Sequence, residues 1–288
     1  MEFGLVLAGG GTRGAAHVGV LLALEEEKIK PTSIAGTSAG SIVAGLYAIG
    51  VSPIELRELV NYLDRKGSHY IDIDYIGLLK FIPQMLLKQK ISLSGLLKGD
   101  KLQQFLCDLT DGKTIKDAKI RTVIPAVDLN SGNTIAYTNS TANKQIEHVK
   151  WEMDIAICDA IMASSSVPAV FRPRSIGGYC FVDGGVTNVM PVDLLIAAGE
   201  KNVIAVDIGE DYQMPEKDTI IEIASHSFSI MSSSLKQCTS TGEKLLLKPT
   251  LPKEAGLLTF EHMNACMEAG YRYTKKRIPL IKKVLYNF

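Results

Sequence analysis

A serine between two glycines, in the pentapeptide Gly36–Gly40 (Gly-Thr-Ser-Ala-Gly), is the feature that most restricts how this chain can fold. The pentapeptide follows a short apolar run, Ser33–Ala35, and opens a run with the pattern of a helix. Glycines on both sides permit a sharp strand-to-helix turn that exposes the serine hydroxyl. The pattern therefore indicates a nucleophile elbow, with Ser38 as nucleophile and Gly36 and Gly40 as its flanks. A helix-capping serine in an ordinary turn is the alternative interpretation.

Strand-type and helix-type runs alternate along the rest of the chain. Strands are expected at Phe3–Ala8, Ile34–Ala35, Arg121–Asp128, Thr134–Tyr137, Tyr179–Val182 and Val203–Ile208. Helices are expected at Arg13–Glu27, Ala39–Gly50, Pro53–Leu63, Trp151–Ala163, Pro191–Ala198, Ile220–Leu235 and Glu261–Leu285. This alternation predicts an α/β fold, a three-layer α/β/α arrangement with a mainly parallel central sheet.

A glycine-rich loop separates the first expected strand from the first expected helix. Its residues are Gly9, Gly10, Gly11, Thr12, Arg13 and Gly14. A dinucleotide-binding loop requires an acid at the end of the second strand, and Ser33–Gly36 contains none. A phosphate-binding P-loop requires a lysine and a hydroxyl residue at its end, and Gly14-Ala15-Ala16 lacks both.

The remaining interpretation of this loop is an oxyanion loop. Its N–H groups can face Ser38 because ligands bind outside the carboxyl ends of parallel strands. Arg13 adds a fixed positive charge that can hold the loop or a phosphate headgroup.

A serine hydroxyl needs a base to act as a nucleophile. The chain order of an α/β-hydrolase triad leaves only His226 or His262, of the five histidines, as the base. Both lie in helix-type runs, and only one strand precedes the strand of the elbow, which is too few for that fold. A Ser-Asp-His esterase therefore stays as an alternative only.

Asp183 is a better partner for Ser38. It ends the strand-type run Phe181-Val182-Asp183 and is followed by Gly184 and Gly185. The two glycines allow close approach of the backbone and an exposed carboxylate. An ordinary Asp-Gly turn has the same sequence.

Together the three motifs resemble the patatin-like phospholipase family, which includes the catalytic domains of patatin and of neuropathy target esterase. The family pattern consists of a Gly-Gly-Gly-x-Arg/Lys-Gly loop, a Gly-x-Ser-x-Gly elbow and an Asp-Gly-Gly/Ala motif, in this order. The proline-bearing stretch Ala163–Pro173 is also similar. The resemblance covers residues 3–208, which we expect to form the catalytic domain. We expect residues 209–288, which match loosely, to be an extension packed on the same domain. The short chain looks like the stand-alone bacterial members.

The resemblance implies a serine lipid-acyl hydrolase with a Ser38–Asp183 dyad and an acyl-enzyme intermediate. Gly9–Gly14 would stabilise the oxyanion, and no cofactor or metal would be needed. The substrate would be a phospholipid, lysophospholipid or other fatty-acyl ester. Activity would fall only in acid, without the titration of an essential histidine. An acyltransferase using the same intermediate, and a non-catalytic lipid- or nucleotide-binding module, remain open alternatives.

Composition bounds the partners and the compartment. The 31 basic and 31 acidic residues cancel, which argues against nucleic-acid binding. Five dispersed cysteines are typical of reduced, buried thiols rather than of a disulfide framework or a zinc site. The N-terminus lacks a signal-peptide pattern and no apolar run reaches 18 residues. We therefore expect a cytoplasmic protein, with peripheral contact at the inner membrane surface.

The segment Tyr75–Gly99 would supply that contact. It contains four lysines, no acidic residue and many large apolar residues. This composition is typical of a segment that lies on a membrane surface. A helical cap that covers the sheet is the alternative interpretation.

Overall fold

The computed structural model describes residues 2–87, 94–209, 227, 230–236 and 241–286. In these residues, nine strands form one sheet in the order β5-β4-β3-β2-β1-β8-β9, with β7 paired to β3 and β6 to β7. The strands are β1 (Gly4–Leu7), β2 (Ser33–Gly36), β3 (Arg121–Asp128), β4 (Thr134–Thr138), β5 (Val149–Glu152), β6 (Arg174–Ile176), β7 (Tyr179–Asp183), β8 (Val203–Val206) and β9 (Leu245–Leu247). The pairs from β3 through β2, β1 and β8 to β9 are all parallel. The expected mainly parallel α/β sheet is confirmed.

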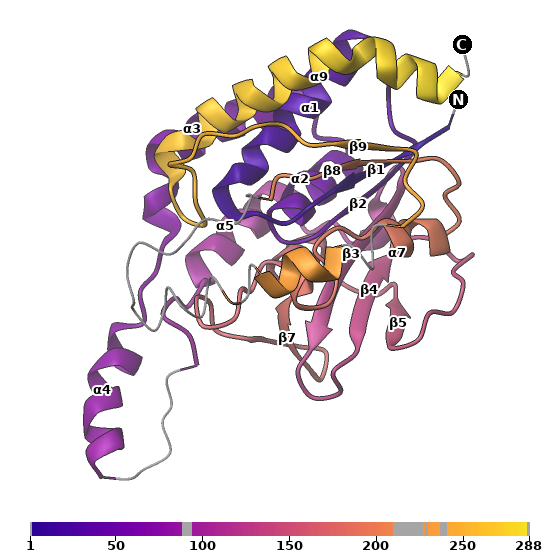
Figure 1. The fold of residues 1–288 in the computed structure, drawn as a ribbon. Coiled ribbons are helices and arrows are strands. Elements are labelled where there is room, and N and C mark those ends of the chain that lie inside the picture. Colours follow the sequence, from indigo (N-terminus) through magenta and orange to yellow (C-terminus); the bar gives the residue numbers. More distant parts are fainter. Residues whose placement is uncertain (1, 88–93, 210–226, 228–229, 237–240, 287–288) are drawn as a thin grey trace.

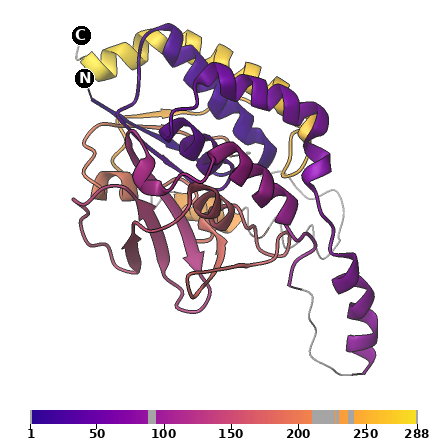
Figure 2. The ribbon, with the colours of Figure 1, turned by 180° about the vertical axis from the view of Figure 1, so that it is seen from behind.

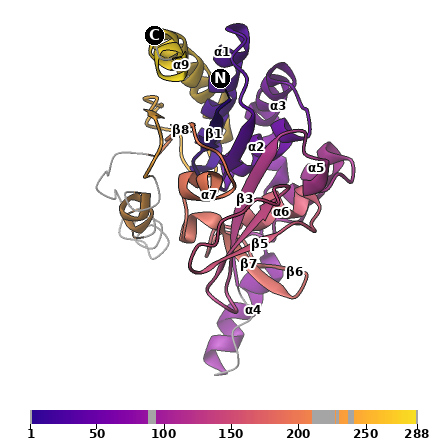
Figure 3. The same cartoon turned by 90° about the vertical axis from the view of Figure 1, so that its right-hand side faces the viewer.

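Helices cover both faces of this sheet. The α-helices are α1 (Ala15–Glu26), α2 (Ala39–Ala48), α3 (Pro53–Lys66), α4 (Tyr75–Leu86), α5 (Asp100–Thr110), α6 (Ile157–Ser164), α7 (Val192–Ala197) and α9 (Met263–Tyr286). The short 3-10 helices are η1 (Gly11–Gly14), η2 (Gly67–Tyr70), η3 (Ile115–Asp117), η4 (Gly184–Val186) and η5 (Phe260–His262). Helices α2 and α6 pack on one face and α7 packs on the other (Figure 3). This arrangement gives the three layers that the alternating pattern predicts.

The C-terminal part of the chain joins the same body. Strand β9 pairs in parallel with β8 and so extends the sheet. Helix α9 lies along α1 (Figure 1), and Gly19 and Gly270 sit at their contact. A Cβ on Gly19 would lie 1.9 Å from the Met267 carbonyl oxygen, so the two helix backbones touch only because this position lacks a side chain.

Helix α4 projects away from this body. It stands apart in two opposite views (Figures 1 and 2). Tyr75, Ile76, Leu79 and Leu87 are exposed on or just after it. The interpretation of Tyr75–Gly99 as a cap is therefore wrong for α4, whereas Leu97, near the end of the segment, is buried in the core. Lys88 and Lys90 lie outside the described residues. No helix within the described residues is both long and apolar enough to cross a membrane.

Several sequence expectations need correction. The run Trp151–Ala163 was expected to be one helix, but β5 continues to Glu152 and α6 begins only at Ile157. The run Ile220–Leu235 lies largely outside the described residues, although residues 230–236 are helical. The sequence pattern did not predict β6, β9 or α5.

The expectation of reduced thiols is wrong for two of the five cysteines. Cys107 of α5 and Cys158 of α6 form a disulfide, so these two thiols are not reduced. Cys180 and Cys266 are free thiols. Spacing cannot reveal this bond, because 51 residues separate two cysteines that only helix packing brings together. Among the described residues, one group could hold a metal, formed by this pair and Asp159. Both of its sulfur atoms are used in the disulfide.

Candidate active site

The turn between β2 and α2 holds Ser38 in a strained conformation. Its backbone angles are φ 53° and ψ −124°, and residues other than glycine rarely adopt a positive φ. The tight turn requires glycines: a Cβ on Gly36 would lie 2.2 Å from the Gly40 carbonyl oxygen. A Cβ on Gly40 would lie 2.2 Å from the Leu7 carbonyl oxygen. This strained, glycine-dependent geometry is the geometry of a nucleophile elbow.

The strained turn is held in place by α6. The backbone N–H of Ser38 donates a hydrogen bond to Oγ of the buried Ser164, at 3.1 Å. Ser38 lies at the N-cap of α2, where the first-turn N–H groups point outward and the helix dipole is positive. Its side chain therefore sits where negative charge is favoured.

The sheet register brings Asp183 to Ser38. Strand β2 pairs with the first part of β3, where Ala35 lies opposite Val123. Strand β7 pairs antiparallel with the last part of β3, where Asp183 lies opposite Ala126. Strand β4 occupies the other edge of β3, so β2 and β7 share one edge and their carboxyl ends point toward each other.

The Ser38 side chain lies close enough to the Asp183 carboxylate for hydrogen bonding to lower the pKa of that carboxylate. The Gly185 N–H also donates a hydrogen bond to the carboxylate, at 2.6 Å to Oδ1. A Cβ on Gly184 would lie 2.3 Å from the Pro125 carbonyl oxygen, so this glycine lets the turn pack on β3. The Asp-Gly-Gly motif therefore fixes the direction of the carboxylate.

Burial sets the basicity of this carboxylate. The expectation of an exposed carboxylate is wrong, because Asp183 is only 2% exposed, and this burial raises its pKa to about 6. The hydrogen bonds from Ser38 and Gly185 oppose this rise without cancelling it. A carboxylate with a pKa near 6 is a stronger base than an ordinary aspartate and is still ionised at neutral pH.

The glycine-rich loop lies against the elbow. A Cβ on Gly9 would lie 3.3 Å from the Ser38 Cβ. The Gly9 N–H is already used, because it donates to the Val189 carbonyl at 3.0 Å. The Arg13 side chain holds the loop by donating from Nε to the Gly10 carbonyl at 3.1 Å. Arg13 thus holds the loop, which is one of the two roles expected from the sequence.

Not every loop N–H is available to a ligand. Thr12 donates its N–H to the Leu257 carbonyl at 3.2 Å. Within the described parts of the chain, the N–H groups of Gly10, Gly11 and Ala39 donate to no protein acceptor. Gly14 packs against the Ala39 side chain, since a Cβ there would lie 2.6 Å from the Ala39 Cβ. Three N–H groups around Ser38 therefore remain as candidate oxyanion donors.

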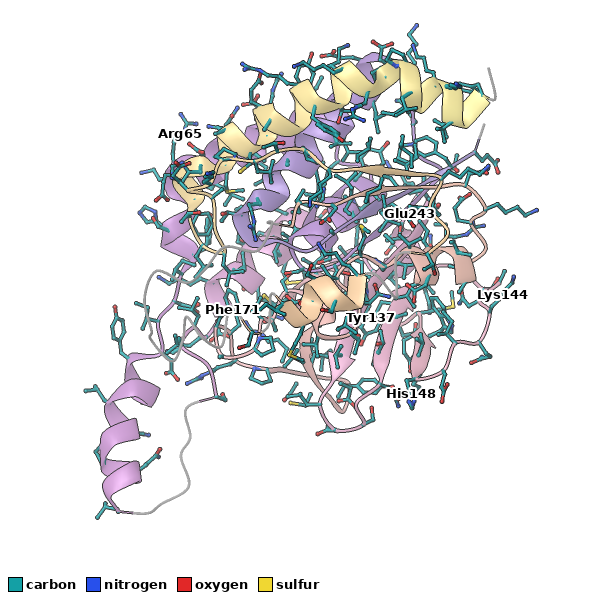
Figure 4. All side chains as sticks on the ribbon, viewed as in Figure 1. Arg65, Tyr137, Lys144, His148, Phe171 and Glu243 are labelled. Atoms are coloured by element: carbon teal, nitrogen blue, oxygen red, sulfur yellow. A yellow bond between two sulfur atoms is a disulfide. The ribbon has the colours of Figure 1, made fainter. Side chains whose placement is uncertain are left out.

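Ser38 lines an apolar cavity of about 130 Å³. Its walls come mainly from α2, α3 and the segment that leads into α9, and include Leu46, Val60, Leu63, Phe171, Leu257 and Met263. Phe171 lies on the side of the molecule from which α4 projects (Figure 4). No sequence motif marks the walls from α3 and from residues 257–263, because their apolar residues come together only in the folded chain.

Among the described residues, no histidine takes part in this constellation. His262 does not line the cavity, and its side chain bonds to neither Ser38 nor Asp183 in the described structure. His17 is buried beneath the loop, where it contacts the Ala8 carbonyl through Nε2 at 2.8 Å. Burial lowers the His17 pKa to about 4, so it stays neutral. His226 lies outside the described residues.

The three motifs of the site lie within a match to a known protein family. A family model described as patatin-like phospholipase matches residues 5–196, which contain the loop, the elbow and the Asp-Gly-Gly motif. The chain belongs to this family.

The patatin-like relatives differ greatly in size. A lysophospholipase NTE1 from Debaryomyces hansenii is 30% identical over 206 residues, 72% of this chain but only 12% of that protein. The uncharacterized protein YqhO of Bacillus subtilis is 29% identical over 227 residues, 74% of each chain. Among solved structures, VipD from Legionella pneumophila matches with a TM-score of 0.49 and 16% identity, over 96% of this chain and 66% of that one.

Proposed function

We propose that this patatin-like protein is a serine lipid-acyl hydrolase that works through a Ser38–Asp183 dyad. The observation that carries the proposal is the contact between a strained, buried serine and a carboxylate whose pKa is raised to about 6 by burial. The serine supplies a nucleophile, the carboxylate supplies a base, and the apolar cavity beside them suits an acyl chain.

In the first half-reaction, Ser38 Oγ attacks the ester carbonyl while Asp183 accepts the hydroxyl proton. The N–H groups of Gly10, Gly11 and Ala39 are the donors we assign to the oxyanion, each worth about 3–4 kcal/mol by the usual effect of one such donor. Asp183 then gives its proton to the departing alcohol, which leaves the acyl group on Ser38.

In the second half-reaction, water attacks the acyl-enzyme and Asp183 serves again as base and then as acid. The acid is released and Ser38 regains its proton. An alcohol in place of water would give acyl transfer, so the outcome depends on which nucleophile reaches the same intermediate.

Hydrolysis of a p-nitrophenyl ester and of a lysophospholipid tests this proposal. Ser38→Ala and Asp183→Asn should each lower kcat by at least about 10³-fold, because each substitution deletes a group that the reaction requires. Asp128→Asn is the matched control, since Asp128 is also a buried aspartate at the end of a strand but contacts Ser131 and Cys180 instead. Full activity in folded Ser38→Ala would exclude the proposal.

We also propose that the α4 arm, defined as residues 71–87 and 94–99, contacts a lipid surface. Large apolar side chains are exposed on α4, with Leu79 at 77%, and Lys80 beside them is exposed too. Large apolar groups next to a lysine suit the interface between acyl chains and anionic headgroups. Figure 1 shows that α4 projects away from the body that contains the sheet.

The root of the arm lies beside the cavity. The Leu97 N–H donates to the Val170 carbonyl at 2.8 Å, next to the cavity-lining Phe171. Asp74 accepts the Gly77 N–H at the start of α4 and pairs with Arg172. A lipid surface that holds the arm would therefore lie close to the opening of the site.

Flotation with anionic vesicles tests the arm. Ile76→Glu combined with Leu79→Glu should abolish flotation, because the new charges oppose both insertion and anionic headgroups. Charge reversal of Lys80 should weaken it. Leu129→Glu, at a side chain that is 55% exposed on the β3–β4 turn, is the matched control and should float like the wild type. Equal flotation of all four proteins would refute a membrane role for the arm.

A further inference from the structure

Ser165 carries a buried hydroxyl that bonds to no group in the described part of the chain. The residue is 6% exposed, and its Oγ has no hydrogen-bond partner. Its backbone, in contrast, is satisfied: the N–H donates to the Met162 carbonyl at 3.2 Å, and the carbonyl accepts the Val167 N–H at 3.0 Å. Buried polar groups are nearly always paired, so a lone hydroxyl in a tightly folded turn requires an explanation.

The two neighbours of Ser165 hold the two members of the proposed dyad. Ser164 Oγ accepts the N–H of Ser38 at 3.1 Å. The Ser166 carbonyl accepts the N–H of Asp183 at 2.9 Å, while its own hydroxyl donates to Met162 at 2.7 Å. Ser165 therefore sits between the attachment points of the nucleophile and of the base, at the end of α6.

The hydroxyl belongs to a residue that lines the same cavity as Ser38. Two other hydroxyl residues of the lining, Thr12 and Tyr70, are already paired. Thr12 Oγ1 donates to the Gly256 carbonyl at 2.7 Å, and the Tyr70 hydroxyl bonds to that of Tyr62 at 2.9 Å. In the described lining, Ser165 is thus the one hydroxyl outside the dyad left without a protein partner.

We propose that the Ser165 hydroxyl donates a hydrogen bond to an oxygen of the scissile ester. This inference rests on the proposed hydrolase function. The polar atoms that every fatty-acyl ester brings beside Ser38 are its two ester oxygens. Binding of the ester therefore pairs a group that is unpaired in the free protein, and that pairing favours ester substrates over hydrocarbon chains that lack the oxygens.

The proposal predicts opposite effects on activity and on stability. Ser165→Ala should lower kcat/KM by about 10- to 100-fold, the usual effect of losing one hydrogen bond to a group that gains charge. The same change should leave Tm unchanged or raise it, because it removes an unpaired buried hydroxyl. A residue with a merely structural role would lose stability and activity together.

The experiment measures kcat, KM and Tm on p-nitrophenyl butyrate and on a lysophosphatidylcholine. Ser165→Thr, which keeps a hydroxyl, should recover part of the loss. Ser232→Ala is the matched control: it removes another buried, unpartnered hydroxyl, 8% exposed and outside the cavity lining, and should leave kcat/KM unchanged.

The results separate this proposal from the proposed function. If the wild type hydrolyses both esters and Ser165→Ala matches it, only the inference about Ser165 is wrong. A loss confined to the lysolipid would place the contact on the glycerol instead, which also overturns the ester contact. If the wild type and Ser38→Ala are equally inactive, the hydrolase assignment fails and the inference falls with it.

Discussion

Replacing Asp183 with asparagine should stabilise the protein at neutral pH while it removes activity. In the folded protein burial raises the pKa of Asp183 to about 6, whereas an aspartate in the unfolded chain titrates near its ordinary pKa of 3.8. The folded state therefore binds this proton more tightly than the unfolded state. The ionised carboxylate costs stability at pH 7, and asparagine carries no such charge.

The magnitude follows from the two pKa values. The free-energy cost of the ionised carboxylate is absent well below pH 4, where both the folded and the unfolded states are protonated. It grows as the pH rises from about 4 to about 6 and is then constant. A difference of about 2 pKa units corresponds to about 3 kcal/mol at pH 7, and the remaining cost at pH 4 is about 0.5 kcal/mol. The amide also exchanges hydrogen bonds with Ser38 and Gly185, but that contribution does not depend on pH.

Urea unfolding of both proteins at pH 7 and pH 4 measures the effect. The free energy of unfolding of Asp183→Asn minus that of the wild type should be about 2 kcal/mol larger at pH 7 than at pH 4. Asp128→Asn should behave oppositely: burial raises the Asp128 pKa, but hydrogen bonds from Cys180, Ser131 and Asn130 outweigh it and hold the pKa below its usual value. That carboxylate stabilises the fold at neutral pH, and its contribution fades as the pH falls. A pH-independent difference for Asp183→Asn would refute the burial argument.

Three further predictions concern catalysis, the cavity and the disulfide. The activity of the wild type should fall in acid with a midpoint near pH 6, as Asp183 becomes protonated, and His262→Ala should show the same profile; a shifted midpoint in that variant would implicate the histidine. Val60→Phe should shift the preferred p-nitrophenyl ester to shorter chains by filling the cavity of about 130 Å³, and an unchanged chain-length profile would place the acyl chain elsewhere. Replacing both Cys107 and Cys158 with serine should lower the free energy of unfolding by about 2–4 kcal/mol, given the 51-residue separation, and equal stability with and without reductant would contradict a contribution from the bond.

Local sequence signals predicted much of the framework of the site. The glycines around Ser38 and after Asp183 mark turns whose backbone leaves no room for a side chain, and such positions can be recognised without a structure. The alternation of apolar runs likewise predicted β3 with the same bounds. These features depend on neighbours in the chain, so a single sequence carries them.

Other features depend on contacts between distant segments. Ser164 and Ser165 resemble any serine at a helix end, and only the folded chain shows that one holds the Ser38 N–H while the other lines the cavity. The Cys107–Cys158 bond was missed for the same reason. The raised pKa of Asp183 follows from burial, which the sequence Asp-Gly-Gly does not reveal.

The central claim is that Ser38 is the acyl-accepting nucleophile. A fluorophosphonate probe reacts covalently with an activated serine, and peptide mass spectrometry locates the adduct. We expect one adduct, on Ser38, and no adduct in Ser38→Ala. Labelling of the wild type should slow below about pH 6, because Asp183 becomes protonated there. An unlabelled wild-type protein, or an adduct on Ser165 or any other residue in place of Ser38, would contradict the claim.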